Sequence, residues 1–233
     1  MDFEFTEEQK MLREAVRSFA AKEIAPLVDE AEDTETFPVQ LFPMMGDLDY
    51  LCLCYSPDYG AAGMGKIGDC IVTEEVAYHS VGIAAGTMVQ AGIGTAAIDR
   101  YGSEEQKHRY LVPAIKGRKV AAFGLTEPNV GSDASAVETK AIRKNGTYIL
   151  NGTKTFITNG SFSDFVTVVA YTDKSKGPKG GMSLFVVEAG TKGFNRSKLH
   201  KFCAYSSEVA ELNFDDCAVP EENLVGEEGK GLY

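Results

Sequence analysis

The sequence predicts an α+β protein in which an all-α domain is followed by an all-β domain, an antiparallel barrel or sandwich. Three observations support this prediction. Apolar residues recur at helical spacing up to residue 118. Beyond that point, short β-rich segments follow one another closely. Two Asn-Gly pairs, Asn145-Gly146 and Asn151-Gly152, separate some of these segments. We therefore expect a helical domain over residues 1–118 and a β-domain over residues 119–233.

The helical domain is expected to begin with a capping box, in which Thr6 and Gln9 satisfy free N–H groups at the start of a helix. Pro26 marks the region where this helix should stop. A second helix should start near Phe37-Pro38 and be short or kinked, because Pro43 lies inside it. The remaining helices are expected over residues 67–79, 82–101 and 103–115.

The β-domain is expected to contain seven short strands. Their β-branched and aromatic residues fit a pleated, half-buried surface. A hairpin is expected at each Asn-Gly pair, because both residues of such a turn must adopt positive φ. The expected strands cover residues 120–126, 137–142, 147–150, 153–158, 165–172, 182–188 and 208–214.

Composition excludes some classes of protein. The 233-residue chain carries a formal net charge of −11, which argues against a nucleic-acid binder, whose surface is basic. No apolar run is expected to approach the roughly 18 to 20 residues of a membrane span. The acidic N-terminus lacks the basic region of a secretory signal.

The cysteines predict a reducing environment. Their number is odd and no Cys-x-x-Cys pair occurs, so we expect free and mostly buried thiols in the cytoplasm or another reducing, soluble compartment. No metal site is expected, because the cysteines and histidines lack ligand spacing. The cysteines are Cys52, Cys54, Cys70, Cys203 and Cys217.

A glycine-rich stretch from Gly60 to Gly68 matches parts of two nucleotide-binding patterns. Residues 63–68 fit the dinucleotide fingerprint, and Leu51 to Tyr55 would be the strand before it. Ile67 stands where a P-loop needs Ser or Thr. A structural loop between helices is the preferred interpretation, with nucleotide binding kept as an alternative.

The polar loop from Gly124 to Asp133 is the most informative functional signal. It leaves an apolar strand and brings hydroxyls, acids and glycines together, groups that can surround a flat polar ligand. A second segment, Lys154 to Gly160, places an aromatic residue two positions before a hydroxyl. Together the segments indicate a flavin site. Glu127 is a conceivable general base, as is Asp133, but carboxylates that cap N–H groups of the loop are the preferred interpretation.

On these motifs the chain resembles the acyl-CoA dehydrogenase family. The family pattern Gly-Leu-Thr-Glu-x-x-small-Gly-Ser-Asp is met except at Val130, and residues 154–160 meet the second flavin pattern. Two further stretches agree, residues 101–107 and 219–231. Tyr205 stands where the family usually has an arginine. The resemblance covers essentially the whole chain in the expected order.

The resemblance implies the first two domains of the family, with the C-terminal four-helix bundle expected to be missing. It implies FAD as cofactor and α,β-dehydrogenation of an acyl-CoA thioester to the 2-enoyl-CoA. It also implies electron-transfer flavoprotein or a similar acceptor as partner, and a homotetramer for the full-length protein. No catalytic residue is assigned, because in most members the bundle supplies the glutamate base. A non-catalytic FAD- or CoA-binding module of the same fold is the alternative.

The resemblance also implies roles for individual residues. Leu125 and Thr126 would bind the pyrimidine edge of the flavin, and Thr158 would reach N5. The implied flavin-binding residues are Phe123, Leu125, Thr126, Gly131, Ser132, Phe156, Ile157 and Thr158. The implied substrate contacts are Ser132 and Lys179.

Two weaker expectations concern the substrate. The helix over residues 82–94 should line the acyl pocket, and its small residues suggest a compact acyl group. Basic residues between Lys192 and Lys201 could attract CoA phosphates, although a solvated face is the preferred interpretation.

Overall fold

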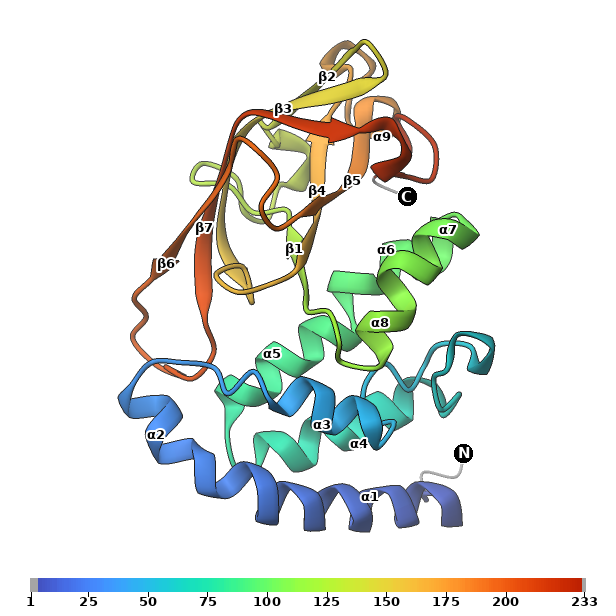
Figure 1. Cartoon of the computed structure of the whole chain (residues 1–233), viewed down its shortest axis with the longest axis vertical. Helices are drawn as coiled ribbons and strands as arrows, with labels where there is room; N and C mark the ends of the chain where they lie inside the picture. Colours follow the sequence, from blue (N-terminus) through green and yellow to red (C-terminus); the bar gives the residue numbers. More distant parts are fainter. Residues whose placement is uncertain (1–3, 232–233) are drawn as a thin grey trace.

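The computed structural model describes residues 4–231 of the chain. Helices occupy the N-terminal half and strands the C-terminal half (Figure 1). In this view the sheet stands above the helical layer, and β1 (Ala121–Gly124) is the first strand to leave that layer.

The helical domain begins as expected and then departs from the prediction at Pro26. The capping box between Thr6 and Gln9 opens α1 (Glu7–Phe19). Helical structure then continues through a π turn and a 3-10 turn, because Pro26 lies in the first turn of the 3-10 segment, where it needs no N–H partner. The later helices are α2 (Val28–Asp33), α3 (Leu41–Asp47), α4 (Gly65–Ala77), α5 (Val81–Ala91), α6 (Ile93–Tyr101), α7 (Glu104–Gln106) and α8 (Val112–Ile115).

The predicted combination of helices and a sheet is confirmed, but the sheet is open and mixed and is not clearly the expected antiparallel barrel or sandwich. Its strand order is β6-β7-β3-β2-β4-β5-β8, with β1 beside β4. The β1–β4 pair is parallel, as is a single residue pair between β2 and β4. The remaining segments are β2 (Lys140–Lys144), β3 (Thr147–Thr158), β4 (Phe165–Tyr171), α9 (Pro178–Gly181), β5 (Met182–Glu188), β6 (Phe194–Leu199), β7 (Val209–Pro220) and β8 (Leu224–Val225).

Only one of the two Asn-Gly pairs makes a hairpin. Asn145-Gly146 joins β2 to β3, with φ of 52° and 74°. Asn151-Gly152 lies inside β3, where the register with β7 shifts. A Cβ on Gly152 would lie 2.5 Å from the hydroxyl oxygen of Thr139, so this glycine permits a close approach of neighbouring backbone instead of a turn. The two strands expected here are therefore one.

The stretch Val81–Tyr101 corrects another expectation. Its 21 residues contain an 18-residue window with a mean hydropathy of 1.5, which is long and apolar enough for a membrane span by length and composition. The stretch is divided at Gly92 into α5 and α6, and 56% of its most apolar window is buried inside the molecule. This packing is that of a core helix pair.

Hydrogen bonds from two fully buried amide side chains connect the sheet to the helices. Gln90 donates to the carbonyls of Ala114 and Lys119 at 2.9 and 2.7 Å, and its Oε1 accepts from Ala121 N at 2.7 Å. Asn159 donates to the carbonyl of Gly86 at 2.9 Å and to that of Ala121 at 3.3 Å. The start of β1 and the end of β3 are thus held against α5.

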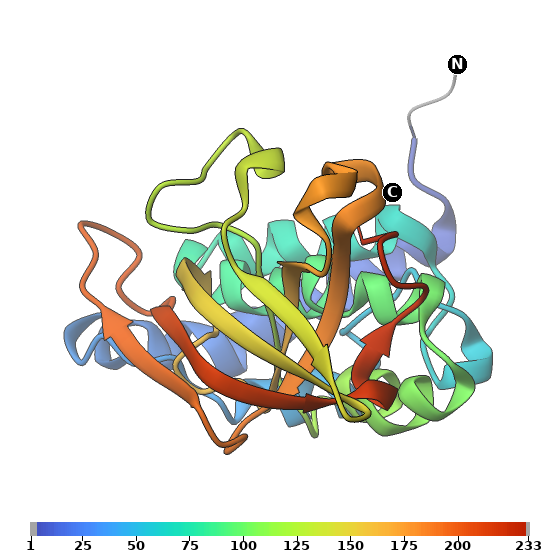
Figure 2. The same ribbon diagram turned by 90° about the horizontal axis from the view of Figure 1, so that it is seen from above.

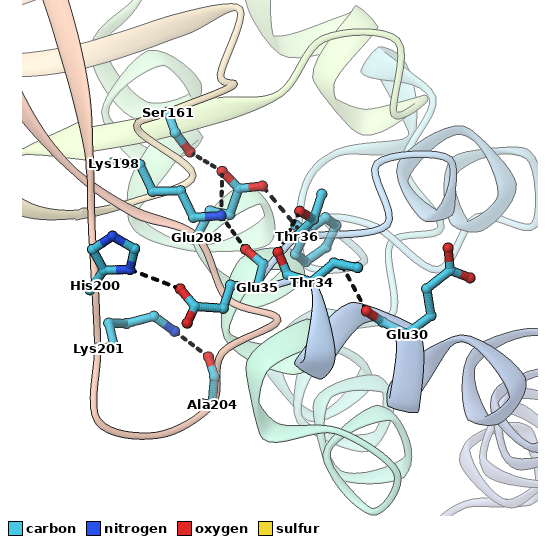
Figure 3. A network of polar contacts seen from close by, with 11 residues as sticks. Glu30, Thr34, Glu35, Thr36, Ser161, Lys198, His200, Lys201, Ala204 and Glu208 are labelled. Atoms are coloured by element: carbon cyan, nitrogen blue, oxygen red, sulfur yellow. Dashed lines mark hydrogen bonds and ion pairs between the residues drawn. The ribbon is translucent and has the colours of Figure 1, made fainter.

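A second connection joins the β6–β7 hairpin to the segment after α2 (Figure 3). Glu208 accepts from Ser161 at 2.7 Å and lies 3.8 Å from Lys198. Lys198 also donates to the carbonyl of Glu35, whose carboxylate lies 3.1 Å from His200. Lys198 and His200 of the basic stretch are therefore engaged with groups of the protein itself, whereas the preferred interpretation was a solvated face.

Candidate flavin site

The loop after β1 doubles back sharply. Glu127 and Val130 exchange two backbone hydrogen bonds of 3.0 Å, with Pro128 and Asn129 at the turn between them. Val130, the departure from the family pattern, is 4% exposed and packs in the apolar core. Its β-branched side chain therefore fills core space and does not crowd the exposed side of the loop.

The exposed side of the loop presents donors that have no partner. Within residues 4–231, the backbone N–H groups of Thr126, Gly131 and Ser132 make no hydrogen bond. The same holds, in this part of the chain, for the hydroxyls of Thr126, Ser132 and Thr158. A Cβ on Gly131 would meet no atom within 4 Å, so a ligand can approach this backbone closely. Donors of this kind suit carbonyl and phosphate oxygens.

Phe156 projects from β3 at a bulge. The register between β3 and β7 shifts between Lys154 and Ile157, and Phe156 has a φ of 57° with 71% of its surface exposed. A non-glycine residue in this left-handed region costs about 1 to 2 kcal/mol. Bulges re-aim side chains, and this one turns the ring away from the core. Ile157 is buried and pairs with Ala210 of β7, so its side chain is not available to a ligand.

The structure brings the two predicted flavin segments side by side. The N–H of Thr155 donates to the carbonyl of Thr126 at 2.8 Å, and Lys154 Nζ donates to the carbonyl of Leu125 at 3.1 Å. Phe123 and Leu125 are partly buried and pack against the core of the helical domain. Residues separated by about thirty positions thus form one surface.

A buried ion pair lies beneath this surface. Lys154 Nζ is 2.7 Å from Glu127 Oε1, and the two side chains are 0% and 4% exposed. Glu127 also accepts from the N–H groups of Glu138 and Thr139 at 2.6 and 3.0 Å. The carboxylate is thus a cap for backbone N–H groups, as preferred from the sequence. Asp133 likewise accepts from Ser135 N at 3.0 Å.

The electrostatics of the pair argue against a proton-accepting role for Glu127. Burial raises the pKa of Glu127, but hydrogen bonds from Lys154, Thr139 and Glu138 outweigh it, so the pKa lies below its ordinary value. Burial also lowers the pKa of Lys154, against the opposing effect of Glu127. A carboxylate with a lowered pKa and occupied oxygens is a poor general base.

Ser132 and Lys179, the two predicted substrate contacts, lie at the same end of the sheet. Both side chains are exposed. Tyr171, the last residue of β4, donates to the carbonyl of Ser135 at 2.9 Å, so the chain leading to α9 starts beside the loop that carries Ser132. Figure 2 shows both loops on the same side of the sheet.

The expected acyl-pocket residues on α5 are only partly available. Met88 is 52% exposed, whereas Gln90 is fully buried and its amide binds backbone groups. A Cβ on Gly82 would lie 2.1 Å from Ser206 Oγ, and one on Gly86 2.4 Å from the ring of Phe37. Packing therefore accounts for these small residues, and they carry no information about the acyl group.

The glycine-rich stretch before α4 does not form a nucleotide-binding unit. Leu51 to Tyr55 is not a strand, and Gly68 lies inside α4, where a Cβ would meet the Cβ of Met64 at 2.9 Å. Gly63 in the loop and Gly65 at the start of α4 have φ of 69° and 66°. The stretch is a structural loop between helical segments, as preferred.

The cysteines are all free, as expected, but they are not mostly buried. Cys52 and Cys217 are buried, and Cys54 is intermediate. Cys70 and Cys203 are exposed. Within residues 4–231 no group of three or more His, Cys, Asp or Glu side chains could hold a metal ion.

Tyr205, which replaces the expected arginine, is held through its backbone. Its N–H donates to Glu32 at 2.8 Å, and Ser206 N donates to the same carboxylate at 3.1 Å. Burial raises the pKa of Glu32, but these bonds and that of the Ser206 hydroxyl leave it below its ordinary value. The segment after β6 is therefore anchored to α2 without an arginine.

Two family models match the chain. Residues 6–118 match the acyl-CoA dehydrogenase N-terminal domain, and residues 122–217 match the acyl-CoA dehydrogenase middle domain. The chain therefore belongs to the acyl-CoA dehydrogenase family.

Individual relatives agree with this assignment. The short-chain-specific acyl-CoA dehydrogenase of Clostridium acetobutylicum is 42% identical over 235 aligned positions, which include 100% of this chain and 61% of that protein. A structure of the electron transferring flavoprotein of Acidaminococcus fermentans contains a chain that superposes with a TM-score of 0.95 at 40% identity, covering 99% of this chain and 61% of that one. A glutaryl-CoA dehydrogenase from Mycobacterium smegmatis in complex with FADH2 gives a TM-score of 0.91 at 31% identity, covering 98% and 57%. The chain thus spans about 60% of the length of these relatives.

Proposed function

We propose that this chain provides the flavin-binding part of an FAD-dependent acyl-CoA dehydrogenase, which converts an acyl-CoA thioester to the 2-enoyl-CoA. One observation carries the proposal. The unpaired donors of the loop over residues 124–133 adjoin a strand from which Phe156 projects outward at a strained bulge. Such strain is characteristic of functional sites. The donor set fits the carbonyls and phosphates of FAD.

Each residue would contribute a defined interaction. Phe156 would pack on the isoalloxazine ring, and the backbone of Leu125 and the hydroxyl and N–H of Thr126 would bind its pyrimidine edge. Thr158 would reach N5, and the backbone N–H of Gly131 would donate to the pyrophosphate. Bound FAD supplies the acceptor for a hydride from the β-carbon of the substrate. Donors arranged before the reaction stabilise developing negative charge more strongly in a dry site than in water.

Ser132 is proposed to contact the thioester arm of the acyl-CoA, and Lys179 is proposed to contact its CoA portion. Their exposure and their shared position at one end of the sheet support this role. The α-proton would be removed by a carboxylate outside this chain, since both acids of the loop are engaged as caps. We further propose that electron-transfer flavoprotein or a similar acceptor takes the electrons. The full-length protein would be a homotetramer in a reducing compartment.

The flavin site is tested by titrating FAD with the chain and following quenching of flavin fluorescence. Phe156→Ala should weaken binding about tenfold, because stacking of an aromatic ring is worth about 1 kcal/mol or more. Phe202→Ala is the matched control, since Phe202 is 94% exposed on a different loop. Equal binding by both variants, or no binding by the wild-type chain, would overturn the site.

The activity is tested without oxygen on the flavin-loaded chain, to which the C-terminal bundle of a relative is added to supply the base. Acyl-CoA thioesters of increasing length should bleach the flavin, whereas free CoA should not. The alternative, a non-catalytic FAD- or CoA-binding module, is favoured by the engagement of both acids of the loop, Glu127 and Asp133, as caps of backbone N–H groups. That alternative predicts a change in the flavin spectrum on ligand binding without bleaching, even when a C-terminal bundle of a relative is added.

A further inference from the structure

We propose that the buried Lys154–Glu127 pair is a positioning device, which fixes the Leu125–Thr126 peptide so that the Thr126 N–H faces the flavin. The inference rests on the proposed function and deepens it. Neither residue would touch the cofactor. Both would act through the backbone of the loop.

The burial of the pair is the first argument. Both charges are almost completely removed from water. Removing a charge from water costs several kcal/mol, and a buried pair often contributes no more stability than apolar side chains of similar volume. Stability alone therefore does not explain why the strand carries a lysine here. An alternative reason is the geometry that the pair imposes on its neighbours.

The contact between Lys154 and the carbonyl of Leu125 supplies that geometry. In a trans peptide the C=O and N–H point in opposite directions, and no cis bond occurs among residues 4–231. Because Lys154 holds the Leu125 carbonyl at 3.1 Å, the N–H of Thr126 points away from the pair. The next carbonyl, that of Thr126, is held by Thr155 N at 2.8 Å. Both peptides that flank Thr126 are therefore fixed from β3.

The charge of Lys154 has a second effect on the same peptide. A cationic donor polarises the carbonyl it binds, which strengthens the N–H of that peptide as a donor. The Thr126 N–H is free within the described part of the chain and is thus available to a ligand. Stronger donation to the pyrimidine edge would stabilise the reduced, anionic flavin.

Glu127 closes the base of the loop. It keeps Lys154 in place at 2.7 Å and binds the N–H groups of Glu138 and Thr139. The backbone N–H and carbonyl of Glu127 also form two hydrogen bonds with the backbone of Val130 across the turn. One carboxylate thus joins the start of the loop to its end at residue 139.

The test replaces the charged pair with a neutral one of similar size, K154M/E127Q. The amide oxygen of the glutamine still accepts from Thr139, whereas the Leu125 carbonyl and the N–H of Glu138 lose their partners. We expect the double variant to remain folded, with a modest fall in the denaturant concentration of unfolding, because the cost of burying two charges is also removed. Its peptide over residues 125–139 should exchange amide hydrogens at least tenfold faster in the ligand-free chain. FAD binding should weaken about tenfold, since a hydrogen bond to a charged group contributes about 1.5 kcal/mol or more, and the reduction potential of bound FAD should fall.

Two further variants separate positioning from general stability. Lys154→Arg keeps the charge and should restore part of the slow exchange. Val219 is a buried residue of β7 that pairs with Tyr148 of β3. Val219→Ala should lower stability without changing exchange in the 125–139 peptide. Wild-type exchange rates in K154M/E127Q, or an unchanged reduction potential despite faster exchange, would overturn the inference. If the wild-type chain binds no FAD, the proposed function fails, and the exchange rates still decide whether the pair fixes the loop.

Discussion

Replacing Gln90 by methionine should remove much of the connection between the helical layer and the sheet. The side chain is fully buried and makes three hydrogen bonds of 2.7 to 2.9 Å to backbone groups from three places in the chain. Each bond contributes about 1 kcal/mol net, and each buried group left unpaired costs about 1 to 3 kcal/mol. Methionine has nearly the same volume, so little cavity cost is added. We expect a loss of about 3 to 6 kcal/mol, a large part of the 5 to 15 kcal/mol typical of a domain.

Urea unfolding followed by far-UV circular dichroism measures this loss in the 233-residue chain. Gln40→Met is the matched control, because Gln40 is exposed and its side chain makes no hydrogen bond within residues 4–231. The control should change the free energy of unfolding by less than about 0.5 kcal/mol. A loss below about 1 kcal/mol for Gln90→Met would refute the assignment of Gln90 as the connecting residue.

Three other predictions address packing, strain and pH. Gly86→Ala should cost about 1 to 3 kcal/mol in urea unfolding, because the new Cβ would lie 2.4 Å from the ring of Phe37; a neutral result would contradict this packing. Phe156→Asn should raise the stability of the ligand-free chain by about 0.5 to 1 kcal/mol, since Asn tolerates the left-handed backbone, and should weaken FAD binding. Hydrogen bonds from Arg17 lower the pKa of Glu75, so this contribution is present above the ordinary carboxyl pKa of 4.5 and is lost as the pH falls through the folded-state value. Glu75→Gln should therefore lose less stability than the wild type between pH 5 and pH 3, as measured by unfolding at each pH; equal acid sensitivity would count against the assignment.

Local patterns predicted the helices well because their signals are local. The Thr6–Gln9 capping box forms as predicted, and the helical segment expected from residue 103 begins with a capping box between Ser103 and Gln106. Pro26 misled the prediction, because a proline stops a helix only where its missing N–H is needed. No feature of the local sequence distinguishes a proline that ends a helix from one that lies in the first turn of a following 3-10 segment.

The sheet was harder to predict, because strand pairing is not local. The Asn145-Gly146 turn was predicted correctly, whereas Asn151-Gly152 is a site of close backbone approach inside a strand. β1 pairs in parallel with β4, whose residues follow about forty positions later. From its own sequence β1 is only another short strand, because its partner cannot be identified. An antiparallel arrangement is then the expectation for closely spaced strands.

The sequence by itself determined the family and the two segments of the candidate flavin site, because their residue types and order are specific. Tertiary structure alone decided how these residues are used. It placed Val130 in the core and turned Phe156 outward at a bulge. It also joined Lys154 to Glu127 beneath the loop. The physical reason is that burial, register and hydrogen-bond partners depend on segments that meet only in the folded chain.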